Sequence, residues 1–131
     1  MQGFEDVKVS WKGADYTIRA TAMMPLVAKM EDILSGDSGK PAVQVLTTGN
    51  GPSVPRLSMA YAAALRHAGA SVSDDEVYLS IINDFAQGNA DVATKIQMAI
   101  HALLAIMAPP IAIAMAADFD DDEKKNQAAE S

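Results

Sequence analysis

Apolar and polar residues alternate near the start of the chain. Val7, Val9 and Trp11 fall on every second position, the spacing of a half-buried strand. Residues 12–15 supply a turn, and residues 16–19 return with β-forming side chains. The sequence therefore predicts an N-terminal β-hairpin within residues 1–20. Two strands alone are marginal in water, so we expect this hairpin to pack on helices or to pair with another chain.

From residue 21 onward the apolar positions recur every three or four residues, as in amphipathic helices. Thr21 and Ser73 are the expected N-caps, and Ser73 forms a capping box with Glu76. Gly69 and Gly88 are expected to end the helices that precede them. The predicted helices are residues 22–34, 56–68, the segment between Ser73 and Gly88, a long helix from residue 89 or 90 to residue 108, and 111–117. Residues 42–46 form either a helical turn or a strand.

Each predicted helix before residue 109 has one apolar face, which we expect to lie in the core. The face of the helix after Ser73 consists of Val77, Ile81, Ile82 and Phe85. The face of the long helix consists of Val92, Ile96, Ile100, Leu103, Leu104 and Met107. The pattern predicts an α+β fold, predominantly α-helical, in which the N-terminal β-hairpin is followed by a bundle of four to five helices.

The longest apolar stretch of the chain, residues 96–117, has roughly the length of a membrane-spanning helix, about 20 residues. Its content argues against a span, because much of it is Ala and His101 lies near its start. Pro109 and Pro110 also remove two backbone donors, which lipid cannot replace. We therefore expect a core helix to about Ala108, followed by a detachable apolar extension.

Composition narrows the class of protein further. With 131 residues the chain has the size of one domain, which we place at residues 1–117, and residues 118–131 form an acidic tail that we expect to be disordered. Cys is absent, so disulfides and thiolate metal sites are excluded. A net charge of −7 argues against a nucleic-acid partner. No secretory signal is evident, and we expect a cytoplasmic protein.

Several short motifs suggest catalysis, but each lacks residues that its chemistry requires. Residues 36–41, GDSGKP, echo the segment around a serine protease nucleophile, but both histidines, His67 and His101, come later in the chain. The same loop lacks the first Gly of a P-loop and has Pro41 after its Lys. We therefore expect no enzyme, no metal site and no cofactor.

Three segments, in their order along the chain, resemble one family. A return strand of the pattern G.DYTIR leads into a helix that ends as MEDIL.G, and a later helix closes as LRHAGASVSDDEV. These segments resemble the tail assembly chaperones of long-tailed phages and the related tail assembly proteins of gene transfer agents. The resemblance covers residues 4–108, and its most specific part is residues 64–77. The two prolines and the acidic tail lie outside the family pattern.

The resemblance implies a small, non-enzymatic protein in the host cell cytoplasm. It would bind the long helical tape measure protein while tail tube subunits polymerise around it, and it would be absent from the finished particle. The tail tube protein is a second candidate partner, and assembly of the chain into a homo-oligomer is a further alternative. Met side chains adapt to varied apolar partners, although they also serve as core filler. The residues expected to contact a partner are Met98, Leu104, Met107, Ile111, Ile113 and Met115.

Two alternatives to a chaperone remain open. The first is a structural tail or head–tail connector protein, whose hairpin joins the sheet of a neighbouring subunit. The second is a small membrane-associated protein that uses residues 98–117.

Overall fold

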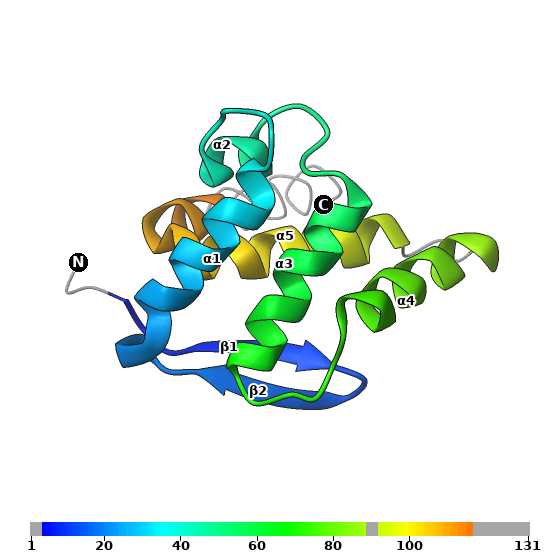
Figure 1. The fold of residues 1–131 in the computed structure, drawn as a ribbon, viewed down its shortest axis with the longest axis horizontal. Coiled ribbons are helices and arrows are strands. Elements are labelled where there is room, and N and C mark those ends of the chain that lie inside the picture. Colours follow the sequence, from blue (N-terminus) through cyan, green and yellow to red (C-terminus); the bar gives the residue numbers. More distant parts are fainter. Residues whose placement is uncertain (1–3, 89–91, 117–131) are drawn as a thin grey trace, which may run out of the picture.

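Residues 4–88 and 92–116 are described by a computed structural model. An antiparallel hairpin, β1 (Val7–Trp11) and β2 (Ala14–Ile18), is followed by a short 3-10 helix, Ala20–Ala22. The further helices are α1 (Met23–Ser35), α2 (Ala42–Thr47), α3 (Val54–His67), α4 (Asp74–Ala86), α5 (Val92–Met107) and residues 109–116. Figure 1 shows the hairpin along one side of the helices. The predicted α+β, mainly helical architecture is confirmed.

The hairpin turns through only two residues, Lys12 and Gly13. Both have a positive φ, 49° and 81°, as the tight turns that match the twist of paired strands require. We predicted a turn over residues 12–15, but Ala14 pairs with Trp11 and belongs to β2. The turn is shorter than predicted because Gly13 adopts a positive φ without steric cost, and two residues then suffice.

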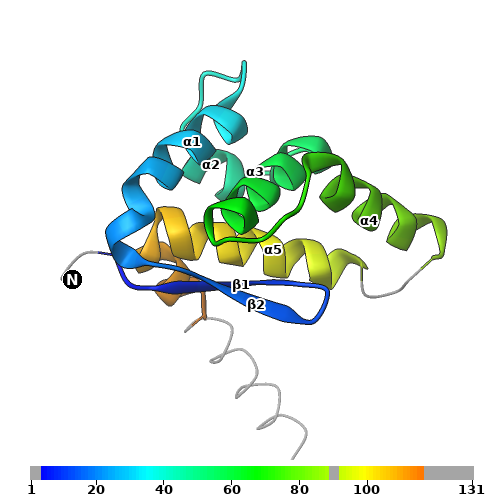
Figure 2. The same ribbon diagram turned by 60° about the horizontal axis from the view of Figure 1, so that its bottom comes forward.

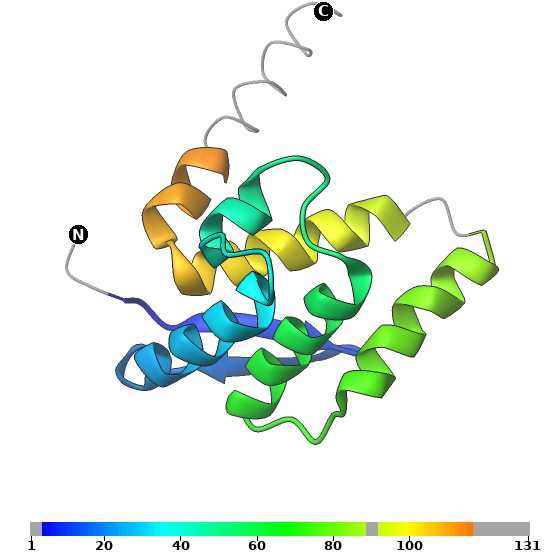
Figure 3. The same cartoon turned by 45° about the horizontal axis from the view of Figure 1, so that its top comes forward.

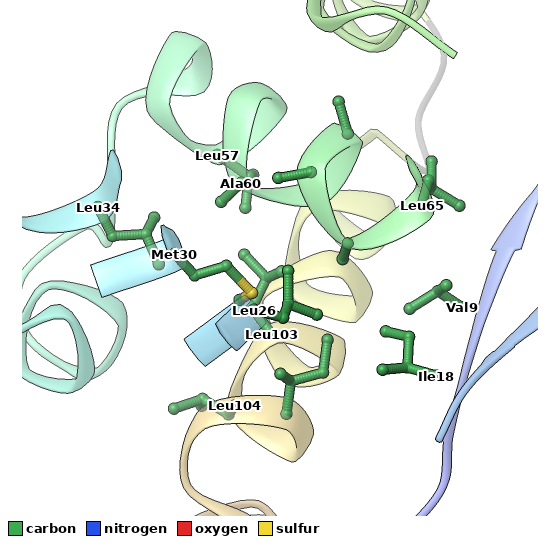
Figure 4. Packing of buried hydrophobic residues seen from close by; sticks show 14 of the residues in the cluster. Val9, Ile18, Leu26, Met30, Leu34, Leu57, Ala60, Leu65, Leu103 and Leu104 are labelled. Carbon is green, nitrogen blue, oxygen red and sulfur yellow. The ribbon is translucent and has the colours of Figure 1, made fainter. Parts of the chain in front are cut away.

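One face of the hairpin is buried and the other is polar. Val9 and Ile18 are almost fully buried, and Figure 4 shows them pointing toward the helices. The side chains on the opposite face are exposed: Lys8, Ser10, Asp15 and Thr17. The prediction that the hairpin packs on the helices is therefore confirmed.

The helix α3 lies at the centre of the helical packing. Its buried residues are mostly Ala: Leu57, Ser58, Ala60, Ala62, Ala63, Ala64 and Leu65. Small side chains allow neighbouring backbones to approach closely, and Figure 3 shows α1 and α4 on either side of α3. Met30 of α1 and Leu103 of α5 are fully buried in the same core.

Several helix starts differ from the prediction. Thr21 is not the N-cap of α1, because residues 20–22 form a 3-10 turn and Ala22 takes the capping position without a side-chain hydrogen bond. The helix α3 begins two residues earlier than predicted, since Ser53 caps it by accepting a hydrogen bond from the N–H of Arg56. The segment whose structure was left open is helical, as α2, and the Glu31 carboxylate accepts a hydrogen bond from its first N–H, at Ala42.

Capping motifs close the junction between α3 and α4. Gly69 has a φ of 107°, and the N–H groups of Gly69 and Ala70 donate to carbonyls of the last turn of α3 over 3.1 and 2.9 Å, the Schellman pattern. Ser73 Oγ accepts from the N–H of Glu76, whose carboxylate accepts from the N–H of Ser73. The predicted helix end and the predicted capping box are both confirmed.

Pro109 and Pro110 begin a new helix directly after α5. Their missing N–H groups cost little in a first helical turn, where such groups have no partner within the helix. The carbonyl of Ala108 accepts from the N–H groups of Ile111 (2.9 Å) and Ala112 (3.1 Å). The helix thus resumes two residues before the predicted position. The predicted tail, residues 118–131, and the predicted start of the long helix lie outside the described residues.

Candidate protein-binding site

An open cavity of about 520 Å³ lies between α3, α4, α5 and the tip of the hairpin. Most of its lining residues are apolar, and we call it the α4–α5 cavity. The residues that line it are Ser10, Trp11, Lys12, Leu57, Tyr61, Val77, Ser80, Ile81, Asp84, Val92, Lys95, Ile96, Met98, Ala99 and Ala102.

Helical spacing determines which residues of α4 and α5 line the cavity. On α4, Val77, Ile81 and Asp84 are three or four residues apart and therefore share one face. On α5, Ile96 and Ala99 are spaced in the same way. Trp11 is the last residue before the hairpin turn, so the tight turn brings its ring to the edge of the cavity, with Lys12 Nζ 5.4 Å from the ring centroid.

Few polar groups reach the α4–α5 cavity, and two of them pair with each other. Lys95 Nζ of α5 lies 3.1 Å from Asp84 Oδ2 of α4, so an ion pair joins the two walls. Tyr61 OH donates to the backbone carbonyl of Ser10 over 2.7 Å. Burial raises the pKa of the Tyr61 hydroxyl. Tyr61 therefore stays a neutral donor that ties α3 to β1.

The outer face of α4 differs from the prediction. Ile82 and Phe85 were expected in the core, but they are 36% and 49% exposed, and Leu79 beside them is also exposed. Both predictions were wrong because α4 lies at the edge of the molecule, as Figures 1 and 3 show. Its neighbours cover only the side that carries Val77 and Ile81.

The structure separates the residues that we expected to contact a partner. Leu104 is fully buried and serves the core, and Met107 is partly buried against it. Met98 is 67% exposed and lines the α4–α5 cavity. The remaining three lie on the helix of residues 109–116 and are exposed: Ile111, Ile113 and Met115. Only Met98 therefore belongs to the cavity.

The polar motifs noted in the sequence have local structural contacts. Ser38 Oγ donates to the carbonyl of Ser35 (2.6 Å) and accepts from the N–H of Lys40 (3.1 Å). His67 Nε2 lies 2.7 Å from the carbonyl of Ala22, whereas His101 is exposed on α5. In the part of the chain that the structure describes, no three His, Cys, Asp or Glu side chains gather as a metal site would require.

Within residues 4–88 and 92–116, no helix combines the length and the apolar content needed to cross a membrane. No protein-family model matches the chain, and comparison with curated proteins and with solved structures finds no match either.

Proposed function

We propose that this protein is a non-enzymatic tail assembly chaperone, which binds apolar helical segments of a tape measure protein during phage-like tail morphogenesis. The observation that carries the proposal is the α4–α5 cavity, which is open, mainly apolar and bordered by the exposed Met98. The resemblance of residues 64–77 to tail assembly chaperones supports the identity of the partner.

The chemistry of the α4–α5 cavity suits a helix. An amphipathic helix docks by inserting side chains at positions i, i+3, i+4 and i+7 into an apolar groove. A volume of about 520 Å³ falls within the usual range of ligand sites, about 300–1,000 Å³. Trp11 and Tyr61 supply the aromatic side chains that often dominate binding energy, and the flexible Met98 adapts to different side chains.

The expected affinity is moderate, as a chaperone that must release its client requires. Burying one large apolar side chain stabilises a complex by about 1.5–3 kcal/mol, and association costs several kcal/mol in lost freedom. This cost offsets much of the gain from a few inserted side chains, so the complex should dissociate readily. Tail tube subunits could displace the chaperone from such a complex.

Co-expression with neighbouring genes tests the proposal. A tail tube gene upstream and a very long tape measure gene downstream are expected. The chain should co-purify with the long helical protein, and Met98→Asp should abolish this because it places a charge at the apolar cavity. Met24→Asp, at an exposed position of α1 outside the cavity, is the matched control. Undiminished co-purification of the Met98 variant would refute the proposed binding site.

A structural tail or connector protein is the second candidate function. The observation that favours it is the hairpin, in which β2 is paired on one side only among the described strands. Asp15 and Thr17 of β2 are exposed, and a strand edge of this kind can extend the sheet of another subunit. The two functions differ in one observable, since a structural subunit persists in mature particles at fixed stoichiometry and a chaperone is missing from them.

A further inference from the structure

The backbone of β2 presents hydrogen-bonding groups at an open edge. In an antiparallel sheet, opposite residues alternate between pairs that exchange hydrogen bonds and pairs whose N–H and C=O groups point outward. Ser10, opposite Asp15, belongs to the second kind, because its carbonyl accepts a hydrogen bond from Tyr61 OH of α3. The next pair of that kind is Lys8 with Thr17. The N–H and C=O groups of Asp15 and Thr17 therefore point away from β1.

The two edges of the hairpin differ in what covers them. The helix α5 contacts β1, and Figures 1 and 3 show β1 between α5 and β2. On its other side, β2 pairs with no second strand among the described residues. Figure 2 shows the hairpin at the surface, with the helices α1, α3 and α4 on one side of it. An unpaired edge of this kind is a template for pairing with another strand.

Two opposite charges flank Thr17 on this edge. Asp15 and Arg19 are exposed, and each is two residues from Thr17, so the three side chains share the polar face of the hairpin. Arg19 directly follows β2 and keeps an extended backbone, with φ −74° and ψ 140°. Within the described part of the chain, its guanidinium forms no ion pair. Edges that avoid pairing commonly carry Lys or Pro, whereas this edge carries two complementary charges.

We propose that the chain forms a symmetric homodimer, in which β2 pairs antiparallel with β2 of a second copy and Thr17 lies at the centre of the pairing. A two-fold interface makes each contact twice. Thr17 meets Thr17 of the second copy, and Asp15 of each copy meets Arg19 of the other. The backbone groups of the two Thr17 residues bond each other, and the N–H of Arg19 donates to the carbonyl of Asp15.

The charges select this register among the symmetric ones. A pairing centred on Asp15 would set two carboxylates opposite each other, which is destabilising. A pairing centred on Tyr16 would set Asp15 opposite Thr17 and leave Arg19 without an acidic neighbour across the interface. Only the pairing centred on Thr17 joins opposite charges at both ends. None of Asp15, Thr17 and Arg19 lines the α4–α5 cavity, and the inference does not rest on the proposed function.

A single introduced Cys tests the register. The chain has no Cys of its own, so a disulfide can form only between two copies. Residues of a hydrogen-bonded antiparallel pair have Cα atoms about 5.5 Å apart, a separation that a disulfide spans. In a glutathione redox buffer, Thr17→Cys should therefore give a covalent dimer on non-reducing gel electrophoresis. Ser10→Cys, which is exposed on the same face of the hairpin but lies on β1, is the matched control and should remain monomeric.

Charge reversal tests the two ion pairs, with sedimentation equilibrium of the full chain as the measurement. Arg19→Asp should raise the dissociation constant of the dimer about tenfold, since two favourable cross-strand pairs become repulsive. Asp15→Arg should weaken the dimer similarly. The double variant Asp15→Arg/Arg19→Asp should restore the wild-type dissociation constant to within about threefold. Lys29→Asp, which makes the same charge change at an exposed position of α1, should dimerise like the wild type.

Three results would overturn the inference. The first is a wild type that sediments as a monomer up to about 1 mM, which would leave the edge of β2 to a different protein. The second is equal cross-linking of the Thr17→Cys and Ser10→Cys variants. The third is a dimer that Arg19→Asp does not weaken, or that the double variant does not restore. Met98→Asp should leave the dimer intact, so failure here is distinguishable from failure of the proposed function.

Discussion

The loop after α1 provides a test of the packing, because a side chain added at Gly36 would meet the guanidinium of Arg56. Gly36 has φ 50° and ψ −131°, a conformation that Gly adopts readily and residues with a Cβ do not. A Cβ added there would lie 2.2 Å from Cζ and Nη1 of Arg56. The same Nη1 donates to the carbonyl of Ile33 over 2.8 Å. Gly36→Ala should therefore strain the backbone and also displace the Arg56 guanidinium.

The cost of Gly36→Ala follows from these two effects. Backbone strain of this kind costs about 1–3 kcal/mol. The lost hydrogen bond of the half-buried Arg56 adds about 1.5 kcal/mol, so the free energy of unfolding should fall by about 2.5–4.5 kcal/mol. Gly39 also has a positive φ, 72°, but no atom lies within 4 Å of an added Cβ. Gly39→Ala should thus cost only the strain, about 1–3 kcal/mol, without the additional loss at Arg56.

Urea unfolding followed by circular dichroism measures both variants, and a double-mutant cycle with Arg56→Ala isolates the contact. In the Arg56→Ala background, Gly36→Ala should cost about 1.5 kcal/mol less than in the wild type, because no guanidinium remains to be displaced. Equal costs for the Gly36 and Gly39 variants, or an additive cycle, would refute the reasoning.

Three further predictions concern other parts of the fold. Tyr61→Phe should cost about 1 kcal/mol at neutral pH, through the lost hydrogen bond. Burial raises the pKa of Tyr61 above 10.0, so the folded state keeps this proton to a higher pH than the unfolded state does. The free energy of unfolding of the wild type should therefore fall as pH rises past 10.0. The fall should be smaller in Tyr61→Phe, which lacks the hydroxyl. Ser73→Ala should cost about 1 kcal/mol through the lost N-cap, measured by urea unfolding. Phe85→Ser, at the exposed face of α4, should cost less than about 1 kcal/mol, whereas Leu103→Ala in the core should cost about 3–5 kcal/mol; similar values for the two would contradict the observed burial.

Features that depend on neighbouring residues could be predicted from the sequence. The capping box of Ser73 and Glu76 and the helix end at Gly69 are specified within a few residues, and both are present. The hairpin likewise follows from local alternation, which places Val9 and Ile18 on the buried face.

Features that depend on distant contacts could not be predicted in this way. The spacing of Ile82 and Phe85 is that of a buried helical face, yet whether a helix lies inside the molecule or at its edge depends on how the other helices pack. Thr21 is a suitable capping residue, but the 3-10 turn that precedes α1 shifts the helix start.

The α4–α5 cavity is another feature that could not be predicted from the sequence, because it depends on distant contacts. Trp11, Tyr61 and Met98 come from β1, α3 and α5, and only the tertiary structure brings them to one cavity. The sequence placed the aromatic Trp11 next to a hairpin turn, but it did not indicate which residues Trp11 faces. Leu104 and Met98 belong to one apolar run, and their opposite burial is decided by which side of α5 the core covers.

Trp11 offers the most direct measurement of whether the α4–α5 cavity binds an apolar helix, as we propose for a tape measure protein. It is the single Trp of the chain and it lines the cavity. Titration with an apolar helical peptide of the kind expected in a tape measure protein should shift its fluorescence emission to shorter wavelength, with saturation. Met98→Asp should abolish the shift, and Met24→Asp should retain it. Peptide binding that leaves the Trp11 emission unchanged and persists in the Met98 variant would contradict the account.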